Sequence, residues 1–170
     1  SLLCTAMTDG LGLNETLETL VFDHVPLCDD NAALWCRAFS FLRTNKVLKS
    51  LSVTFELDVT ESCFFAFCVD IAAILQENVS LESLRVQWRD SSFKIKADDY
   101  FFVVTALQRN TTITTLGLYH DGSLQLMDDE SKEMASLLKK NYALERLPDI
   151  GMVGDVGAIL QLNAAGRRYL

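Results

Sequence analysis

The sequence has no apolar run long enough to cross a membrane and no segment that resembles a signal peptide. Its longest apolar stretch, CFFAFCV at residues 63–69, is far shorter than the roughly 20 residues that a membrane-spanning helix needs. No segment has the basic-then-apolar layout of a secretory leader. We therefore expect no membrane insertion.

Basic side chains are too few for a nucleic-acid-binding protein. The chain has 15 Lys and Arg against 23 Asp and Glu, which gives a formal net charge of −8. Proteins that bind duplexes or anionic lipid neutralise phosphates with Lys and Arg, so this balance argues against both partners. A protein partner with a basic surface is compatible with it.

Groups that support catalysis or metal binding are equally scarce. The two histidines, His24 and His120, are far apart in sequence, and the pair of His24 with Cys28 has no third residue to orient it. The glycines at 151, 154 and 157 lack the Lys and the Ser or Thr of a phosphate-binding loop. We expect no catalysis, no metal site and no cofactor.

The cysteines favour an intracellular protein. They are odd in number and form no CxxC motif, so we interpret them as reduced, small hydrophobic residues: Cys4, Cys28, Cys36, Cys63 and Cys68. Asn14, Asn78 and Asn110 begin N-x-S/T sequons, which would carry sugar in a secreted chain. The odd thiol count favours the cytoplasm, with an organelle as the alternative.

One short frame recurs five times and gives these asparagines another role. It places Asn14, Asn45, Asn78, Asn110 and Asn141 at steps of 31, 33, 32 and 31 residues. Leucine or isoleucine follows three places on, and leucine six places on. A fixed spacing of about 20–50 residues is typical of a solenoid, in which each unit buries its apolar face against its neighbours.

The residues before each asparagine follow a helical period. Apolar residues recur seven places before it, and leucine always stands three places before it. Trp35 falls on the same buried stripe. Acidic residues mark the expected helix starts, where they suit free N–H groups and the positive end of the helix dipole: Asp29–Asp30, Asp58, Asp98–Asp99 and Asp128–Asp129.

The period changes to two after each asparagine. Apolar residues six and eight places on, except Asp149 in the last unit, predict a short strand with one buried face, and Trp88 continues that buried phase. The asparagine itself falls in the turn, where Asn tolerates left-handed geometry and bonds to its own backbone. Because strands pair at about 4.8 Å and helices pack at about 8–10 Å, the array should curve with a parallel sheet on its concave side.

This pattern resembles a known repeat family. The motif LxxNxxLxxLxL, seen as Leu75, Asn78, Leu81, Leu84 and Val86, resembles the leucine-rich repeats of the ribonuclease-inhibitor-like class. The resemblance covers nearly the whole chain and implies an α/β leucine-rich repeat solenoid with a curved parallel sheet inside and helices outside. The family carries Asn or Cys three residues after the last strand leucine. Here that place holds Val25, Glu56, Arg89 and Asp121, so we expect less regular loops.

The two ends differ in their expected caps. We assign five repeats to residues 1–150 and a C-terminal cap helix to residues 151–170. The cap repeats the helical offsets at Val156, Ile159, Leu160 and Asn163, and Gly166 provides a stop. The ending LNAAGRRYL resembles the terminus of many leucine-rich repeat proteins from unicellular eukaryotes. Residues 1–13 carry helical offsets, so we expect the first repeat to start inside its helix and to expose an apolar edge that either further repeats upstream or a partner would cover.

The outward strand positions form three predicted ladders across the concave face. They are Thr19, Ser50, Ser83, Thr115, Arg146; then Val21, Ser52, Arg85, Gly117, Pro148; then Asp23, Thr54, Gln87, Tyr119. Arg and Tyr are residue types that anchor interfaces. We predict a partner-binding surface formed by Asp23, Thr54, Arg85, Gln87, Tyr119 and Arg146. The alternative is a solvated sheet face with ordinary polar residues.

These features favour a non-catalytic module that binds a protein partner through a rigid repeat surface. One alternative is a structural subunit of a large assembly, docked by its uncapped N-terminal edge or by loops such as residues 89–97. A narrower alternative is an actin-capping domain of the tropomodulin type, because that domain is also a five-repeat array with a final helix.

Overall fold

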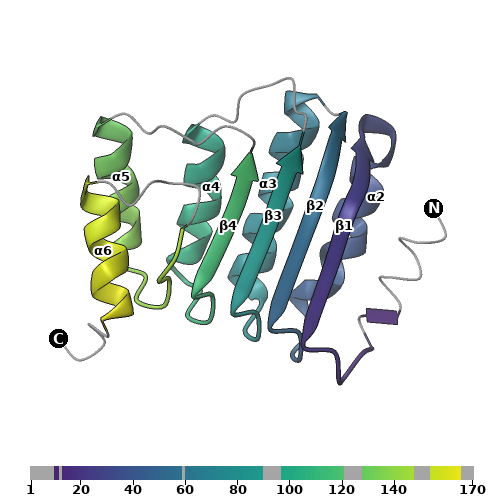
Figure 1. Ribbon diagram of the computed structural model, residues 1–170, viewed down its shortest axis with the longest axis horizontal. Helices are drawn as coiled ribbons and strands as arrows, with labels where there is room; N and C mark the ends of the chain where they lie inside the picture. Colours follow the sequence, from purple (N-terminus) through teal and green to yellow (C-terminus); the bar gives the residue numbers. More distant parts are fainter. Residues whose placement is uncertain are drawn as a thin grey trace.

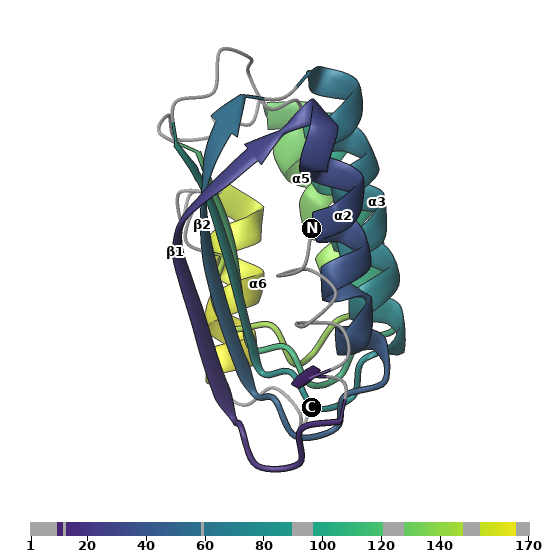
Figure 2. The same ribbon diagram turned by 90° about the vertical axis from the view of Figure 1, so that its right-hand side faces the viewer.

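The computed structural model describes residues 10–11, 13–58, 60–89, 97–120, 128–147 and 154–165. Its four strands are all parallel and lie in the order β1-β2-β3-β4, with every helix but the last along one side of the sheet and the last helix at the end of the array (Figures 1 and 2). The strands are β1 (Thr19–Cys28), β2 (Ser50–Asp58), β3 (Ser83–Arg89) and β4 (Thr115–His120). The helices are α2 (Asp29–Phe39), continued by the 3₁₀ helix η1 (Ser40–Arg43), α3 (Glu61–Glu77), α4 (Ala97–Leu107), α5 (Asp128–Leu138) and α6 (Gly154–Ala164).

The strands pair in the register that the sequence frame predicts. The first ladder is confirmed through Thr19, Ser50, Ser83 and Thr115, and an isolated bridge adds Arg146 beyond β4. The second ladder is confirmed through Val21, Ser52, Arg85 and Gly117, whereas Pro148 lies outside the described residues. Because every strand starts five residues after its asparagine, side chains at equal repeat positions lie side by side.

A bulge in β1 interrupts the third ladder. The register shifts between Phe22 and Val25, so Asp23 and His24 stand opposite Thr54 alone. His24 adopts the left-handed region, with a φ of 53°. Asp23 therefore does not continue the ladder of Thr54, contrary to the prediction, because one extra residue breaks the period of two.

The repeating asparagines join each unit to the one before it. In Asn45, Asn78, Asn110 and Asn141 the side-chain oxygen accepts from the backbone N–H groups two and three residues on, which closes the turn as predicted. The side-chain nitrogen of each donates to two backbone carbonyls of the preceding unit. The sequence pattern does not predict these two bonds between units. Among the described residues other than glycine, His24 alone has a positive φ. Left-handed geometry is therefore not what these turns require of Asn.

The core lies between the sheet and the helices. The strand leucines of the second to fifth units are at most 2% exposed: Leu51, Leu84, Leu116 and Leu147. An aromatic cluster fills the N-terminal half, where neighbouring ring centroids lie 5.4–6.2 Å apart and every pair meets edge to face except the tilted pair of Trp35 and Phe39: Trp35, Phe39, Phe55, Phe67 and Trp88. Trp35 and Trp88 are buried, as predicted. Edge-to-face contacts of this kind add stability beyond the burial of apolar area.

The helix starts agree with the acidic residues in three units of four. α2 begins at Asp29, α5 begins at Asp128, and Asp98 is the second residue of α4. The prediction for Asp58 is wrong, because it is the last residue of β2 and α3 begins at Glu61 after Thr60. At α2 the Asn31 oxygen accepts from the Cys28 backbone N–H over 2.9 Å, so the Asn31 amide takes part in the cap at this end.

The C-terminal cap helix is present as predicted. α6 packs against α5 at the end of the array, and Val156, Ile159, Leu160 and Asn163 are all buried (Figure 1). The Asn163 nitrogen donates to the carbonyls of Asn141 and Leu144, so it continues the chain of asparagine bonds without a further repeat. The predicted first-unit helix over residues 1–13 lies mostly outside the described residues, although Gly10 and Leu11 are helical.

Candidate functional site

No helix of the described residues covers the second face of the sheet. We call it the open sheet face and define it by the residues that alternate with the core residues of the strands, two of which, Thr54 and Gly117, are themselves buried: Thr19, Val21, Asp23, Ser50, Ser52, Thr54, Glu56, Ser83, Arg85, Gln87, Thr115, Gly117 and Arg146. The burial pattern of β3 shows the alternation directly, since Leu84, Val86 and Trp88 are buried while Arg85 is exposed. Small hydroxyl residues occupy its centre and are partly exposed: Ser50, Ser52, Ser83 and Thr115.

Two arginines lie on the C-terminal half of this face. Arg85 is exposed in β3, and Arg146 is exposed where its backbone bridges to Thr115 of β4. Gly117, which pairs with Arg85, has no side chain that would separate them. Arg146 lies two strand spacings from β3 and two residues further back along the strand direction, so the Cα atoms of Arg85 and Arg146 are roughly 12 Å apart. A single acidic segment of a partner can therefore contact both guanidinium groups.

The opposite corner of the open sheet face carries acidic residues around the bulge. His24 Nδ1 lies 2.6 Å from Glu56 Oε1, and His24 Nε2 lies 3.6 Å from Asp23 Oδ2. All three side chains are more than half exposed, so these contacts contribute little to stability. The bulge instead places an imidazole between two carboxylates, and no sequence signal distinguishes this arrangement from an ordinary strand end.

The predicted site residues are therefore only partly brought together. Arg85 and Gln87 are on the open sheet face with Arg146 across β4, and Asp23 is at the bulge. Thr54 is only 9% exposed, so its side chain offers little surface to a partner. Tyr119 pairs with Gln87 through the backbone of β4, but its side chain lies outside the described residues.

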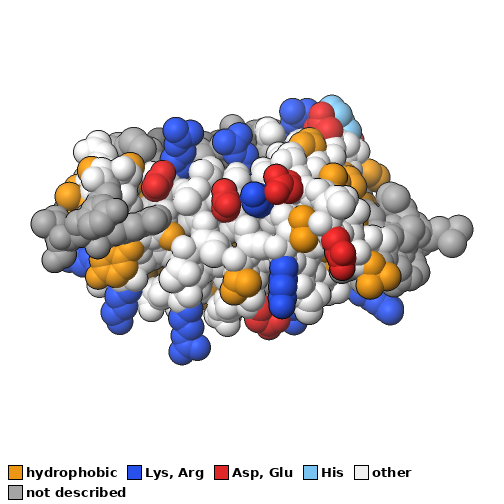
Figure 3. All heavy atoms as spheres, turned by 90° about the horizontal axis from the view of Figure 1, so that it is seen from below, with side chains coloured by type: hydrophobic (Ala, Val, Ile, Leu, Met, Phe, Trp, Pro, Cys, Tyr) orange, Lys and Arg blue, Asp and Glu red, His pale blue; other side chains and the backbone are white. Residues whose placement is uncertain are grey.

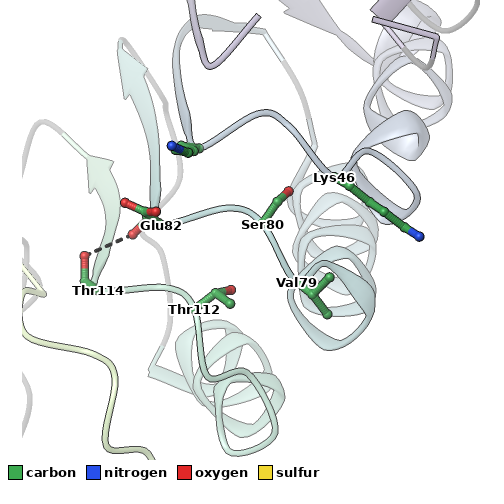
Figure 4. A pocket seen from close by; sticks show the side chains of 7 residues that line it. Lys46, Val79, Ser80, Glu82, Thr112 and Thr114 are labelled. Carbon is green, nitrogen blue, oxygen red and sulfur yellow. Dashed lines mark hydrogen bonds between the residues drawn. The ribbon is translucent and has the colours of Figure 1, made fainter. Parts of the chain in front are cut away.

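A shallow groove of about 420 Å³ lies at the edge of the array formed by the asparagine turns. Three successive turns contribute Lys46, Val79, Ser80, Glu82 and Thr112 (Figure 4). Its hydroxyl groups are already used, because Ser80 Oγ donates to the carbonyls of Asn45 and Leu48 and Thr114 Oγ1 donates to that of Glu82.

The charges around the turn groove do not favour a small-molecule site either. Lys49 also lines the groove, and its Nζ lies 3.0 Å from Glu18 Oε1, an acceptor and a negative charge that raise the pKa of Lys49. Basic and acidic side chains are interspersed over this edge (Figure 3). Sites that hold small molecules are usually concave and mostly apolar, with a few polar groups that point at the ligand. This groove is shallow, and its hydroxyl groups already bond to the protein itself, so it does not resemble such a site.

Two kinds of site can be assessed for the part of the chain that the structure describes. No group of three or more His, Cys, Asp or Glu side chains there is arranged to hold a metal ion. No described helix is long and apolar enough to span a bilayer. Cys68 is buried in the core and Cys36 packs against it, as predicted for small hydrophobic residues.

Comparisons with known proteins identify the fold. No protein-family model matches the chain, and no curated protein matches it. Among solved structures, one described as "Leiomodin-1 Actin-Binding Site 2 (ABS2)" superposes with a TM-score of 0.67 at 18% identity, covering 98% of this chain and 90% of that one. The tropomodulin C-terminal domain from Caenorhabditis elegans superposes with a TM-score of 0.70 at 11% identity, covering 98% and 96%. The chain therefore has an α/β fold of the leucine-rich repeat type, as predicted; its place in the ribonuclease-inhibitor-like class stays a prediction.

Proposed function

We propose that this chain is a non-catalytic module that binds a protein partner through the open sheet face. The observation that carries the proposal is the placement of Arg85 and Arg146 on one rigid surface by four strands in register. A surface formed before binding avoids the entropy cost of ordering a loop. Arginine is enriched at interface hot spots, and its planar fork matches a carboxylate.

The charges suggest how a partner is oriented. The formal net charge of −8 favours a partner with a basic surface overall, which speeds encounter. Within the contact, Arg85 and Arg146 favour acidic side chains, while Asp23 and Glu56 at the other corner favour basic ones. Gln87 lies on β3 and pairs through the backbone with Tyr119 of β4, whereas Thr54, at 9% exposed, offers a partner little surface.

Actin is the specific partner that we put forward for testing. One neighbour in fold is described as an actin-binding site, and the other belongs to tropomodulin, whose domain matches this chain over 98% of its length. At 18% and 11% identity this support comes from the fold alone, so the assignment of actin as the partner depends on a binding measurement.

We further propose that the protein acts inside the cell. The sequon residues Asn78 and Asn110 are only 3% and 4% exposed, so in the folded chain they are not available to carry sugar.

The test compares two charge-matched double variants. Arg85→Ala/Arg146→Ala removes both arginines from the open sheet face, and Lys46→Ala/Arg109→Ala removes two exposed cations from elsewhere. We expect co-sedimentation with filamentous actin to weaken by at least about tenfold in the first variant and to stay near that of the native chain in the second. Equal affinities of the native chain and the first variant would contradict the role of the open sheet face.

If the native chain does not bind actin, actin is excluded as the partner, but the proposal that the chain binds a protein through the open sheet face is still tested by a second experiment. In that case the native chain and the same variants serve as baits for affinity capture with mass spectrometry. The proposal predicts a protein that the native chain and the Lys46→Ala/Arg109→Ala variant retain and that the Arg85→Ala/Arg146→Ala variant loses.

A second candidate is a structural subunit that docks by its N-terminal edge. Leu17 and Leu20 are half-buried, whereas their counterparts Leu48 and Leu51 are 2% and 1% exposed. The outer edge of β1 is protected against strand addition beyond residue 22, because the bulge and Pro26 interrupt its hydrogen-bonding groups. Docking there would use the apolar side chains of the first unit. Co-purification in fixed stoichiometry supports this candidate, and reversible binding to one ligand supports the first.

A further inference from the structure

Helices α3 and α4 carry an exposed aromatic pair on the side of the array away from the open sheet face. The rings of Phe65 and Phe102 meet edge to face with centroids 5.8 Å apart, although the two residues are 44% and 47% exposed. Val69, one turn after Phe65, is 36% exposed. We call these three residues the aromatic helix patch.

The patch is not part of the protein's own core. The buried side of α3 carries Phe67, Ile71 and Leu75, each at most 3% exposed. Its outer side is also largely apolar, because Ala66 is exposed and Ala73 is partly exposed beside Phe65 and Val69. A helix that is apolar on every side is usually buried on every side. The outer side of α3 therefore has the composition of a contact surface.

Exposed apolar side chains concentrate at this one place. Eight large hydrophobic residues are exposed in the described part of the chain, and three of them form the patch. The other five are distributed over separate elements: Leu13, Val21, Val79, Tyr142 and Leu162. The neighbouring helices carry charged residues outside, such as Arg37 on α2 and Lys132 and Glu133 on α5. A contiguous apolar group with such surroundings marks an interaction site.

The charges of α3 and α4 indicate which kind of partner fits. These helices contain no Lys or Arg and five acidic residues: Glu61, Asp70, Glu77, Asp98 and Asp99. Arg43 of η1 lies 3.6 Å from Asp70 and 3.9 Å from Glu77, and Arg109 follows the C-terminal end of α4. An anionic membrane would be repelled by such helices. A second copy would bring two chains of net charge −8 together.

We propose that the aromatic helix patch binds an amphipathic helix of a partner protein that is apolar on one side and bordered by Lys or Arg. Apolar side chains at helical spacing would cover Phe65, Val69 and Phe102, as in other complexes where a helix docks on an apolar surface. The basic border would face Asp70 and Glu77 of α3, two carboxylates that share the single cation Arg43 and so keep a net negative charge. This site is separate from the open sheet face and does not depend on its function.

The experiment measures binding of a synthetic helix by fluorescence anisotropy near physiological salt. The probe is a Leu/Lys peptide of about 18 residues, or five helical turns, with leucines at i, i+3, i+4 and i+7. A peptide with Glu in place of Lys and a scrambled Leu/Lys peptide are its controls. Phe65→Ser/Phe102→Ser removes the patch, and Leu162→Ser removes a side chain of equal exposure, 46%, from α6.

We expect the native chain and Leu162→Ser to bind the Leu/Lys helix with the same affinity. The Phe65→Ser/Phe102→Ser variant should bind about tenfold or more weakly, and the Glu and scrambled peptides should bind the native chain at least as weakly as that. Equal binding of the peptide by the native chain and the double variant would overturn the proposal. It would show that the cationic peptide is attracted only by the negative net charge of the protein and not by the aromatic helix patch. A dimer in light scattering that only the double variant loses would overturn it in favour of a second copy. The Arg85→Ala/Arg146→Ala variant should bind the peptide normally, so the two surfaces are tested independently.

Discussion

The side-chain nitrogen of Asn78 donates to the backbone carbonyl of Asn45, one repeat earlier, over 3.1 Å. The oxygen of the same side chain accepts from the N–H groups of Ser80 and Leu81 within its own turn. One buried amide thus closes a turn and ties two repeats together. The carbonyl of Leu42 is its fourth partner.

Replacing Asn78 by Ala should destabilise the fold strongly. Four hydrogen bonds to backbone groups are lost. The Asn45 carbonyl keeps the bond from Ser80 Oγ, while the Leu42 carbonyl and the N–H groups of Ser80 and Leu81 lose this partner, at about 1–3 kcal/mol for each buried group left unsatisfied. We expect the free energy of unfolding to fall by about 3–5 kcal/mol, measured by urea denaturation. Asn14→Ala is the control. Its side chain bonds only to its own turn among the described residues and is partly exposed, so a loss of about 1–2 kcal/mol is expected. Equal losses at the two positions would refute the role of the inter-repeat bonds.

Replacing His24 by glycine should leave the protein more stable than replacing it by alanine. His24 has a φ of 53°, a region that costs residues with a Cβ roughly 1 kcal/mol and costs glycine almost nothing. Both variants lose the contact with Glu56, so their difference isolates the backbone. We expect His24→Gly to be about 1 kcal/mol more stable than His24→Ala in thermal or urea unfolding. At a regular strand position the order would be reversed, and that order would disprove the bulge.

Two phenylalanines of α3, only two residues apart, should respond differently to truncation. Phe67 is 2% exposed and packs against the rings of Phe39, Phe55 and Trp88, so Phe67→Ala should cost about 3–5 kcal/mol. Phe65 is 44% exposed, and we expect Phe65→Ala to cost less than about 1 kcal/mol. Chemical denaturation of the two variants checks the contrast. A large loss at Phe65 would place it in the core and remove it from the aromatic helix patch.

The ammonium group of Lys49 should titrate above its ordinary value of 10.5, because it donates a hydrogen bond to the Glu18 carboxylate. A raised pKa in the folded state contributes stability that is present below the unfolded pKa and is lost as the pH rises through the folded pKa. Glu18→Gln should therefore lower the pKa of Lys49, observed by NMR of its side chain. Because the Lys49 side chain is 50% exposed, stability near neutral pH should hardly change. An unchanged Lys49 titration in the variant would exclude Glu18 as the cause.

The sequence predicted a large part of the candidate site through register alone. Constant spacing from each asparagine placed Arg85 beside Gly117 and Arg146 beside Thr115, and these pairs are found. It did not predict that Thr54 is 9% exposed, because burial of a strand residue depends on what lies beside it, here a bulge in β1. The sequence pattern also did not predict that Phe65 and Phe102 are exposed on the surface. The signal was in the sequence, since "CFFAFCV" is apolar at every helical phase, but only the packing shows which of its rings face outward.

The sequence by itself determined the repeat, the two faces of each unit, the parallel order of the strands and the closing helix. These follow from periodicity, which is a local property of the chain, repeated with nearly constant spacing. The tertiary structure decided what links the units and what remains available to partners. The second role of the asparagines, the bulge at His24 and the exposed pair of Phe65 and Phe102 each depend on atoms more than 30 residues away. Contacts of that range form only when one repeat is stacked on the next.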